Sequence, residues 1–241
     1  MKKIVFITGA GMSAASGLQT FRGSDDSLWN NHRVEDVCTA SALLNNPTLV
    51  NDFYNMRRIE ILNAEPNEAH LEIADNECNF DIHIITTNID NMHERAGSTK
   101  ILHLHGEILK ARSSNSSYDW MGMSHDEKIN NPKLYDVGRK GLNYYKDYAE
   151  DGFPLRPHVV LFDESVPLIN DAAAIVRSAD ILCIIGSSLS VYPAASLYAL
   201  KSDECELYYI DPSNDNIING CTHIREDAVD GIFTFFDSIM M

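Results

Sequence analysis

The sequence predicts an α/β fold, in which a Rossmann-like, parallel six-stranded sheet carries helices on both faces and a smaller lobe is inserted. The first observation behind this prediction is that short apolar, β-branched runs recur with helix-like or irregular stretches between most of them. The second is a glycine turn and a helix start directly after the first run. Runs of this kind are typical of parallel strands buried on both faces. They lie at residues 4–7, 82–86, 101–104, 159–162, 181–185 and 207–210.

Two predicted helices follow the first strand. Asn46 and Pro47 provide a cap and a first-turn proline, and the apolar stripe of that helix is expected at Leu49, Val50, Phe53 and Met56. Pro66 opens the second helix, through Ala69, Leu71 and Ile73. These helices are too long for a simple crossover, so we expect them in the smaller lobe.

The length of 241 residues suits one domain with two lobes. The Rossmann lobe is predicted at approximately residues 1–35, 80–107 and 156–241, and the smaller lobe at approximately residues 36–79 and 108–155.

Composition excludes several classes of function. The formal net charge of −16 disfavours nucleic acid and favours a basic protein or peptide partner. Five widely spaced cysteines form no C-x-x-C pair, which is typical of core residues in a reducing compartment. The first apolar run is too short for a signal peptide, and none reaches the length of a membrane span. A cytoplasmic location is therefore expected.

The glycine turn is the most informative segment and reads GAGMSAASGLQTFRG at residues 9–23. Gly9, Gly11 and Ala14 match G-x-G-x-x-G/A, whose backbone N–H groups approach a pyrophosphate at the start of a helix. No second strand ending in a ribose-binding acid follows, which disfavours an ordinary hydride-transfer enzyme. A dinucleotide is the first ligand to consider, although the turn alone also fits a packing role.

Polar residues follow two other predicted strands. Asn88 and Asp90 come after residues 82–86, and Gly186, Ser187 and Ser188 come after residues 181–185. Ligands collect at the carboxyl ends of parallel strands, so these side chains are expected beside the glycine turn. The alternatives are helix capping by Asn88 and Asp90 and an unremarkable turn at Gly186.

His103 and His105 would share a face of one strand by alternation. A metal pair is conceivable, but no third ligand is evident. We interpret His105 as a general base, because Gly106 beside it would leave room for a ligand.

Tyr54 and Arg57 lie three residues apart on a helix and so share a face. Such a pair on an exposed face usually has no special role. An arginine fork beside a phenol is also a good receptor for a carboxylate.

Taken together, these segments resemble the sirtuins, the NAD-dependent protein-lysine deacylases, and in particular the class III bacterial branch. The similar stretches occur in the family's order, over most of the chain from Ile4 to Pro212. They are GAGMSAASGLQTFRG, LWNNHRVEDV, FYNMRR, PNEAH, TTNIDNMHERAG, HLHGE, RPHVVLFDE and GSSLSVYPAA.

The resemblance implies that NAD and an acyl-lysine enter a cleft between the lobes from opposite sides. The glycine turn would cradle the pyrophosphate, Asn88 would position the ribose, and Asp90 the nicotinamide carboxamide. In the family's reaction the acyl oxygen attacks C1′ as nicotinamide leaves, and the base, here His105, then deprotonates a ribose hydroxyl. Nicotinamide, acyl-ADP-ribose and free lysine result.

Site residues carried over from the resemblance fall into three groups. The catalytic residues are His105 and Asn88. The NAD-binding residues are Gly9, Ala10, Gly11, Ser13, Ser16, Phe21, Arg22, Trp29, Asn88, Ile89, Asp90, Gly186, Ser187, Ser188, Asp211 and Ala228. The substrate-binding residues are Tyr54, Arg57, Val160, Phe162 and Val191, and Tyr54 with Arg57 matches the signature of enzymes that accept succinyl- or malonyl-lysine. The partners would be acyl-lysine proteins or peptides, without nucleic acid or membrane, and the chain would be a monomer or a weak homo-oligomer.

The chain departs from the family at the zinc site. Ser113 stands where the first of four cysteines is expected, and no cysteine occurs between Cys78 and Cys183. We therefore predict no structural zinc. Other contacts must then hold residues 112–153, with Tyr118, Trp120, Tyr144, Tyr145 and Tyr148 as candidates.

Four single replacements bear on specificity. They are Thr87 for Gln, Asp163 for Gly in F-G-E, Tyr209 for an Asn near the adenine ribose, and Cys38 for the small alanine of the acyl pocket. Asp163 would narrow the peptide groove or favour basic peptides. ADP-ribosyl transfer or NAD hydrolysis in the same cleft is the alternative activity, and a non-catalytic NAD sensor is a third reading that the presence of His105 disfavours.

Overall fold

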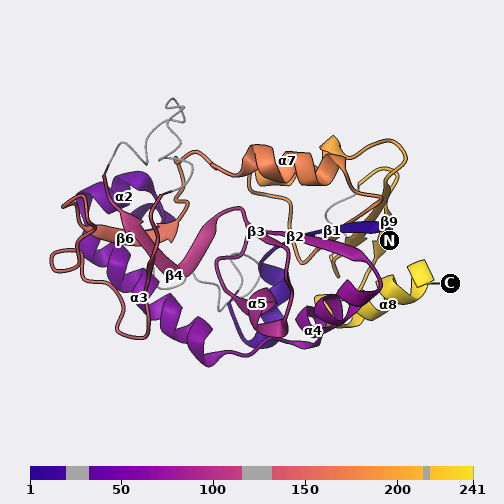
Figure 1. The fold of residues 1–241 in the computed structure, drawn as a ribbon, viewed down its shortest axis with the longest axis horizontal. Helices are drawn as coiled ribbons and strands as arrows, with labels where there is room; N and C mark the ends of the chain where they lie inside the picture. Colours follow the sequence, from indigo (N-terminus) through magenta and orange to yellow (C-terminus); the bar gives the residue numbers. More distant parts are fainter. Residues whose placement is uncertain (20–32, 116–131, 214–217, 241) are drawn as a thin grey trace. The chain divides into compact units, whose positions relative to one another are not determined.

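The computed structural model describes residues 1–19, 33–115, 132–213 and 218–240, which form two compact units (Figure 1). Unit 1 comprises Met1–Thr20, Glu65–Leu104 and Leu168–Met241, and unit 2 comprises Phe21–Ala64 and His105–Pro167. This division differs from the expected lobe boundaries at residues 65–79, 105–107 and 156–167, which exchange units, and at residues 21–35.

Unit 1 is built on a parallel six-stranded sheet with helices on both faces, as the sequence predicts. The strand order is β3-β2-β1-β7-β8-β9. The strands are β1 (Lys3–Thr8), β2 (Asp81–Thr86), β3 (Ile101–His103), β7 (Ile181–Ile185), β8 (Glu206–Ile210) and β9 (Thr222–Ile224). Five of the six apolar runs form strands of this sheet.

The sixth strand is not the one predicted. Residues 159–162 were expected in the parallel sheet, but β6 (Leu155–Val159) pairs antiparallel with β4 (Gly106–Ser113) in unit 2. The place is taken by β9, whose sequence Thr-His-Ile carries too weak an apolar signal to be recognised. Periodicity identifies a strand but not its partner, which is why the assignment was wrong.

Helices cover the sheet of unit 1 on both sides (Figure 1). One face carries α7 (Ile169–Arg177), and the other carries α4 (Glu68–Asp75), α5 (Met92–Ala96) and α8 (Ala228–Met240). The helix opened by Pro66 therefore belongs to unit 1 rather than to the smaller lobe. The physical reason is burial, since Ala69 and Ile73 are fully enclosed in the main core. The 3₁₀ helices η1 (Ala10–Ser16), η3 (Asn76–Cys78) and η5 (Ala194–Leu200) complete the unit.

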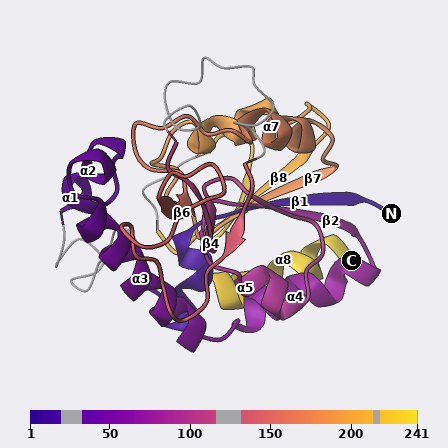
Figure 2. The same cartoon turned by 60° about the vertical axis from the view of Figure 1, so that its left-hand side comes forward.

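In the described residues of unit 2, an antiparallel sheet with the strand order β5-β4-β6 is accompanied by helices (Figure 2). These elements are β5 (Tyr135–Asp136), α1 (Val34–Val37), α2 (Ala40–Asn45) and α3 (Pro47–Asn63). Asn46 caps α3 by accepting a hydrogen bond from the Leu49 N–H, as its sequence suggests. The expected stripe is only partly right, because Met56 is 44% exposed whereas Arg57 and Arg58 are buried.

A small apolar core packs around β4, the strand that carries Ser113. Ala111, Val137, Leu142, Ala149 and Leu155 form it, with Tyr135 packed against them. The Ser113 hydroxyl donates to Asp151 Oδ2 at 2.7 Å, so this position links two segments by a hydrogen bond.

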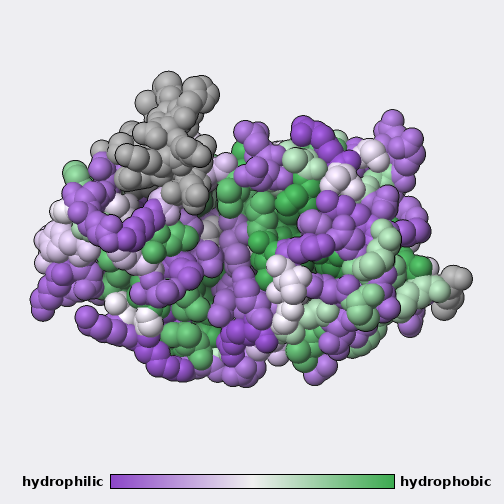
Figure 3. Space-filling model, in the orientation of Figure 1, coloured by the Kyte–Doolittle hydropathy of each residue, from purple (hydrophilic) through white to green (hydrophobic). Residues whose placement is uncertain are grey.

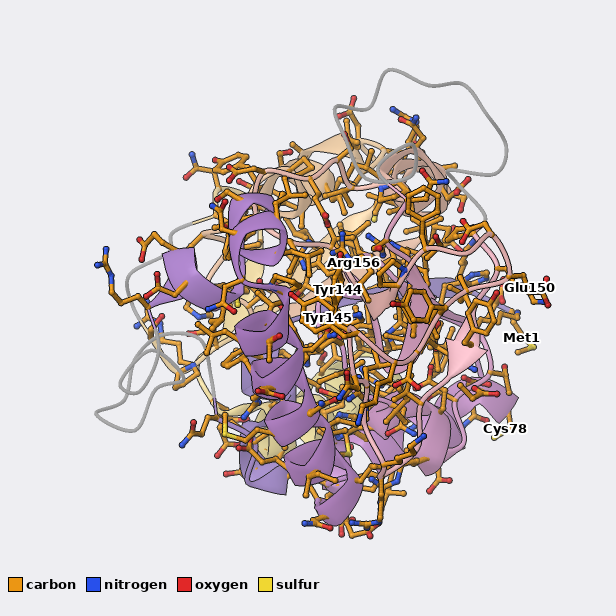
Figure 4. The ribbon with its side chains drawn as sticks, turned by 90° about the vertical axis from the view of Figure 1, so that its left-hand side faces the viewer. Met1, Cys78, Tyr144, Tyr145, Glu150 and Arg156 are labelled. Carbon is orange, nitrogen blue, oxygen red and sulfur yellow. The ribbon has the colours of Figure 1, made fainter. Side chains whose placement is uncertain are left out.

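The proposed tyrosine contribution to this region is wrong at two positions. Tyr145 and Tyr148 are 65% and 53% exposed. Tyr144 is half-buried, and its ring centroid lies 5.5 Å from that of Tyr145 (Figure 4). Tyr118 and Trp120 lie outside the described residues.

Buried charges are paired in unit 2. The Arg156 guanidinium contacts both carboxylate oxygens of Glu164, at 2.5 and 3.2 Å. Arg112 lies 3.6 Å from the same carboxylate, and the Leu161 N–H donates to it at 2.7 Å. Such an array offsets the cost of removing these charges from water only because its geometry is nearly complete.

Candidate active site

The carboxyl edge of the sheet in unit 1 gathers most of the predicted site residues. The chain leaves β1 toward β2 and β3 on one side and returns to β7 on the other, so the strand order reverses between β1 and β7. Ligands of open parallel sheets bind at such a switch point, outside the carboxyl ends of the strands. Gly9 and Gly186, which follow β1 and β7, meet there.

The two glycine turns at this point are in direct contact. The Gly9 N–H donates to Ile185 O, and the Gly11 N–H donates to Gly186 O at 2.8 Å. A Cβ on Gly9 would lie 2.7 Å from Gly186 O, and one on Gly186 would lie 2.3 Å from Met12 N. Glycine is thus required by packing here, and two of the N–H groups expected to face a pyrophosphate serve the contact between the turns.

Ser13, Asn88 and Asp90 form a buried polar cluster beside these turns. Asn88 Nδ2 donates to Gly9 O at 2.9 Å and to Ser13 Oγ at 3.2 Å. Ser13 Oγ donates in turn to Asp90 Oδ2 at 3.0 Å. Each of the three side chains is less than 10% exposed. The structure therefore brings the glycine turn and the segment after β2 together, as expected.

Asp90 also has a local role. Its Oδ1 accepts a hydrogen bond from the Met92 N–H at the start of α5. The capping interpretation is therefore right for Oδ1, whereas Oδ2 belongs to the polar cluster. Burial raises the pKa of Asp90, while the hydrogen bonds from Met92 and Ser13 lower it. A desolvated carboxylate with lone pairs to spare suits an amide or hydroxyl donor of a ligand.

The segment after β7 carries the hydroxyl groups of Ser187 and Ser188, and Tyr209 contacts its backbone. The Tyr209 hydroxyl donates to Ser187 O at 3.0 Å, and its ring stacks on His223. Ser187 is half-buried and Ser188 exposed, whereas Tyr209 is fully buried. Tyr209, which stands where an Asn is expected, thus fixes the backbone of the Ser187 turn by a hydrogen bond.

The remaining predicted NAD contacts of unit 1 are placed as follows. Ala10, Ser16, Ile89 and Asp211 are half-buried, and Ala228 is buried at the start of α8. Thr87 donates from its N–H and its hydroxyl to Thr8 O, which ties the segment after β2 to the end of β1. Phe21, Arg22 and Trp29 lie outside the described residues.

The two histidines of the H-L-H-G segment do not share a strand face. β3 ends at His103, and His105 lies in the turn before β4, where its carbonyl accepts from the Val160 N–H. His103 Nε2 lies 2.6 Å from Glu94 Oε1 in unit 1, whereas His105 belongs to unit 2. The alternation argument was therefore wrong, and the role of His105 as base stays a prediction.

Gly106 is required by its backbone conformation and by packing. Its φ is +83°, and a Cβ would lie 2.2 Å from His158 O on the paired strand. The glycine is needed for the turn and for the approach of β4 to β6. The pairing of β4 with β6 therefore accounts for this glycine, and space for a ligand beside His105 stays a prediction.

Tyr54 and Arg57 are buried in unit 2 rather than exposed, at 4% and 7%. The Tyr54 hydroxyl donates to Cys38 Sγ at 3.6 Å, and Arg57 Nη1 pairs with Glu60. Burial raises the pKa of the Cys38 thiol to about 11, although Tyr54 and the Arg57 charge oppose the shift. The structure thus joins a cation, a phenol and a neutral thiol on one side of α3.

Two predicted peptide contacts, Val160 and Phe162, lie on a segment that pairs with residues 38–40. The Phe162 N–H donates to Cys38 O, and the Ala40 N–H donates to Phe162 O. Val160 is half-buried, Phe162 is 43% exposed, and Val191 of unit 1 is 39% exposed. Asp163 is exposed with φ +72°, a left-handed conformation that explains a glycine at this position.

Two contacts were missed by sequence reasoning. Tyr209 supports Ser187, and Asn67 donates to Met12 O and Ser16 Oγ. The P-N-E-A-H stretch was the only signal for Asn67, because the contact spans 55 residues.

The described residues contain neither a cluster of metal ligands nor a membrane-spanning helix. Residues 1–19, 33–115, 132–213 and 218–240 contain no cluster of three His, Cys, Asp or Glu side chains arranged to hold a metal ion. Within the same ranges no helix is long and apolar enough to span a bilayer. On the face seen in Figure 3, hydrophilic residues are interspersed with smaller apolar areas.

Sequence comparison relates the chain to one family. A family model described as the Sir2 family matches residues 9–193. An "NAD-dependent protein deacylase" of Helicobacter pylori (strain ATCC 700392 / 26695) is 44% identical over 231 residues, covering 95% of this chain and 93% of the relative. A protein of the same name from Bacteroides thetaiotaomicron is 44% identical over 234 residues, covering 96% and 95%.

Solved structures show the same relationship. A crystal structure of a Sir2 homolog–NAD complex matches with a TM-score of 0.82 and 30% identity, covering 99% of this chain and 90% of that one. A mutant Sir2 homologue in complex with ADP ribose matches with a TM-score of 0.83 and 29% identity, covering 100% and 94%.

Proposed function

This chain belongs to the Sir2 family, and we propose that it is an NAD-dependent protein-lysine deacylase that releases nicotinamide and acyl-ADP-ribose. The observation that carries the proposal is the 44% identity, over 95% of the chain, to a bacterial NAD-dependent protein deacylase. The polar cluster at the switch point of the sheet supports it from the structure.

The residues of that cluster fit NAD by their chemistry. Ser13, Asn88, Asp90, Ser187 and Ser188 offer hydroxyl, amide and carboxylate groups, which suit ribose hydroxyls and a carboxamide. We propose that Asp90 accepts from the carboxamide and that Asn88, fixed by Gly9 O and Ser13, orients the ribose. Bound NAD supplies an electrophilic ribose carbon with nicotinamide as its leaving group.

His105 is the proposed base. An imidazole titrates near neutral pH and can take a hydroxyl proton without prior activation. The hydrogen bond from the Val160 N–H to its carbonyl fixes the backbone of the turn that carries it. Val160 and Phe162, on the segment paired with residues 38–40, are the proposed contacts for the substrate peptide.

The test of this function is peptide-dependent nicotinamide release. We expect the protein with NAD and an acyl-lysine peptide to yield nicotinamide, acyl-ADP-ribose and free lysine by mass spectrometry. The variant His105→Ala should lose activity by about 10²-fold or more, because general base catalysis contributes on that order. His83→Ala, which changes a half-buried histidine of β2, is the matched control and should keep its activity.

Two outcomes would contradict the proposal. Nicotinamide release at the same rate without peptide would indicate the alternative activity, NAD hydrolysis or ADP-ribosyl transfer. Binding of NAD without turnover of any acyl-peptide would indicate a sensor.

We further propose that the enzyme accepts succinyl- and malonyl-lysine besides acetyl-lysine. Arg57 is a buried cation beside the Tyr54 phenol, and a buried guanidinium binds a carboxylate more strongly than an exposed one. The contact of Arg57 with Glu60 shows that this guanidinium already accommodates one carboxylate.

Arg57→Met tests the acyl preference. We expect desuccinylation to fall at least tenfold further than deacetylation, since only the dicarboxylic acyl group loses a charged partner. Kinetics with matched acetyl and succinyl peptides on one protein preparation measure the ratio, so any loss of folded protein cancels. Equal losses for the two peptides would contradict the assignment.

Location and partners follow from composition. We propose a cytoplasmic protein, monomeric or weakly associating, that acts on basic proteins and does not bind nucleic acid. The net charge of −16 supports the choice of partner, and the five cysteines, all free in the structure, suit a reducing compartment.

A further inference from the structure

Asn67 connects two elements of unit 1 through one side chain. It precedes α4 as its N-cap, and its Nδ2 donates to Met12 O at 2.9 Å and to Ser16 Oγ at 3.1 Å. Met12 and Ser16 both belong to η1, the short helix that follows the glycine turn. A residue far away in sequence therefore holds η1 at two of its residues.

The other end of the same amide is used as well. Asn67 Oδ1 accepts from the Ala69 N–H at 3.1 Å and lies 3.4 Å from the His70 nitrogen of the backbone. His70 Nδ1 lies 3.0 Å from this oxygen, in a ring that is fully buried. A flipped amide would set its NH₂ group against two N–H donors, so the environment fixes which end faces η1.

The start of η1 is anchored differently. The Gly11 N–H donates to Gly186 O, and Ser13 joins Asn88 and Asp90. Asn67 adds a contact at Met12, between these two anchors, and one at Ser16, the last residue of η1. Ordering a binding loop before the ligand arrives reduces the entropy lost on binding, so a fixed η1 strengthens the binding of any ligand that contacts it.

We propose that Asn67 is a positioning residue for the NAD site, which acts by holding Ser16 and the Met12 carbonyl in place without touching the ligand. The identity of the ligand rests on the function proposed above. His70 Nδ1 accepts from the Asn67 backbone N–H at 3.4 Å in the same capping box, and burial lowers the pKa of this ring to about 4.

Asn67→Asp separates this role from helix capping. Aspartate caps helices as well as asparagine and has the same shape, so α4 keeps its cap. It lacks the N–H donor and sets a carboxylate oxygen against Met12 O. We expect KM and Kd for NAD to rise about tenfold, with kcat and the KM for acyl-peptide changed less than threefold. Asn67→Ser keeps a cap without the charge, and a smaller rise of the same kind is expected.

Asn46→Asp is the matched control. Asn46 is also a helix N-cap, and its Oδ1 accepts from the Leu49 N–H at the start of α3 in unit 2. The same substitution there should leave the KM and Kd for NAD unchanged. Thermal melting of all three variants identifies any that fail to fold.

A measurement on ligand-free protein makes the test independent of activity. Amide hydrogen exchange in η1 should be at least tenfold faster in Asn67→Asp than in wild type or Asn46→Asp, with exchange in α4 unchanged. Isothermal titration with NAD gives the Kd.

The possible results distinguish the two proposals. Wild-type protein that fails to bind NAD would overturn the proposed function and the NAD part of this inference together. Normal NAD binding by wild type, with unchanged Kd and unchanged η1 exchange in both Asn67 variants, would overturn the inference alone. Faster exchange throughout α4 would show a capping role instead and would also overturn it.

Discussion

Unit 1 and unit 2 handle buried ionisable side chains in opposite ways. In unit 1, burial lowers the pKa of His70 to about 4 and that of His93 well below its usual value, so both rings are neutral. In unit 2, the buried Arg156 guanidinium is paired with the Glu164 carboxyl group. Unit 1 thus keeps two buried imidazoles neutral, whereas unit 2 pairs a buried arginine with a buried glutamate.

The difference follows from the size of the apolar core in each unit. Unit 1 buries the continuous apolar strands β1 and β7, which leave few groups to solvate an ion. Unit 2 has a small core around Ala111 and Leu155, and its buried arginines bond to carboxylates and carbonyls instead. A unit with a small core can therefore be held by polar pairs, provided that each pair is complete.

The largest expected effect comes from breaking the charge pair of unit 2. Glu164→Gln leaves the buried Arg156 guanidinium without that carboxylate, and we expect the free energy of unfolding to fall by about 3–5 kcal/mol. Denaturant unfolding measures it. Glu206→Gln, which removes an exposed partner of Lys2, is the control and should change stability by less than about 1 kcal/mol. A loss as small as the control's would remove the distinction between the units.

The neutral histidines of unit 1 predict a pH dependence. The folded-state pKa of His70, about 4, lies below the unfolded value of about 6.5, so the unfolded chain binds more protons between these pH values. The free energy of unfolding should therefore decrease as the pH falls from about 6.5 to 4, by up to about 3 kcal/mol from this group. His93 acts in the same direction.

His70→Gln checks the cause, since it removes one titrating ring. Its unfolding free energy, measured across the same pH range, should fall less steeply than that of wild type, whatever the stability of the variant at pH 7. Identical slopes would show that His70 is not buried as a neutral group.

The smallest expected effect concerns the hydrogen bond between Ser113 and Asp151, at the position where the first zinc-binding cysteine of the family is expected. Ser113→Ala removes the hydrogen bond to Asp151 Oδ2 and should cost about 1 kcal/mol. A metal chelator should leave the melting temperature of wild type unchanged, because Ser113 and the lack of cysteines between Cys78 and Cys183 predict no structural zinc. Metal analysis that found one zinc per chain would refute this prediction.

The parts of the fold that could be predicted are those whose hydrophobic pattern is visible in a short stretch of sequence. Strands such as β1, β2 and β7 are buried on both faces, so they read as continuous apolar runs. β9 is three residues long, and the antiparallel partner of β6 depends on contacts that no period reveals. The same limit placed α4 in the wrong lobe.

The candidate site divides in the same way. Asn88, Asp90 and Ser187 could be located because they directly follow predicted strands, and parallel strands end at one edge. Asn67 and Tyr209 act on η1 and on the Ser187 turn through folding contacts, 55 and 22 residues away. Their roles needed coordinates.

The contact between the glycines that follow β1 and β7 limits which positions can be varied in protein engineering. Even a methyl group at Gly11 or Gly186 would overlap backbone atoms of the facing turn, at 2.8 Å and 2.3 Å. Libraries intended to redirect ligand preference should keep these positions invariant and randomise the exposed Ser188, because Ser187 is half-buried and lies against Gly9.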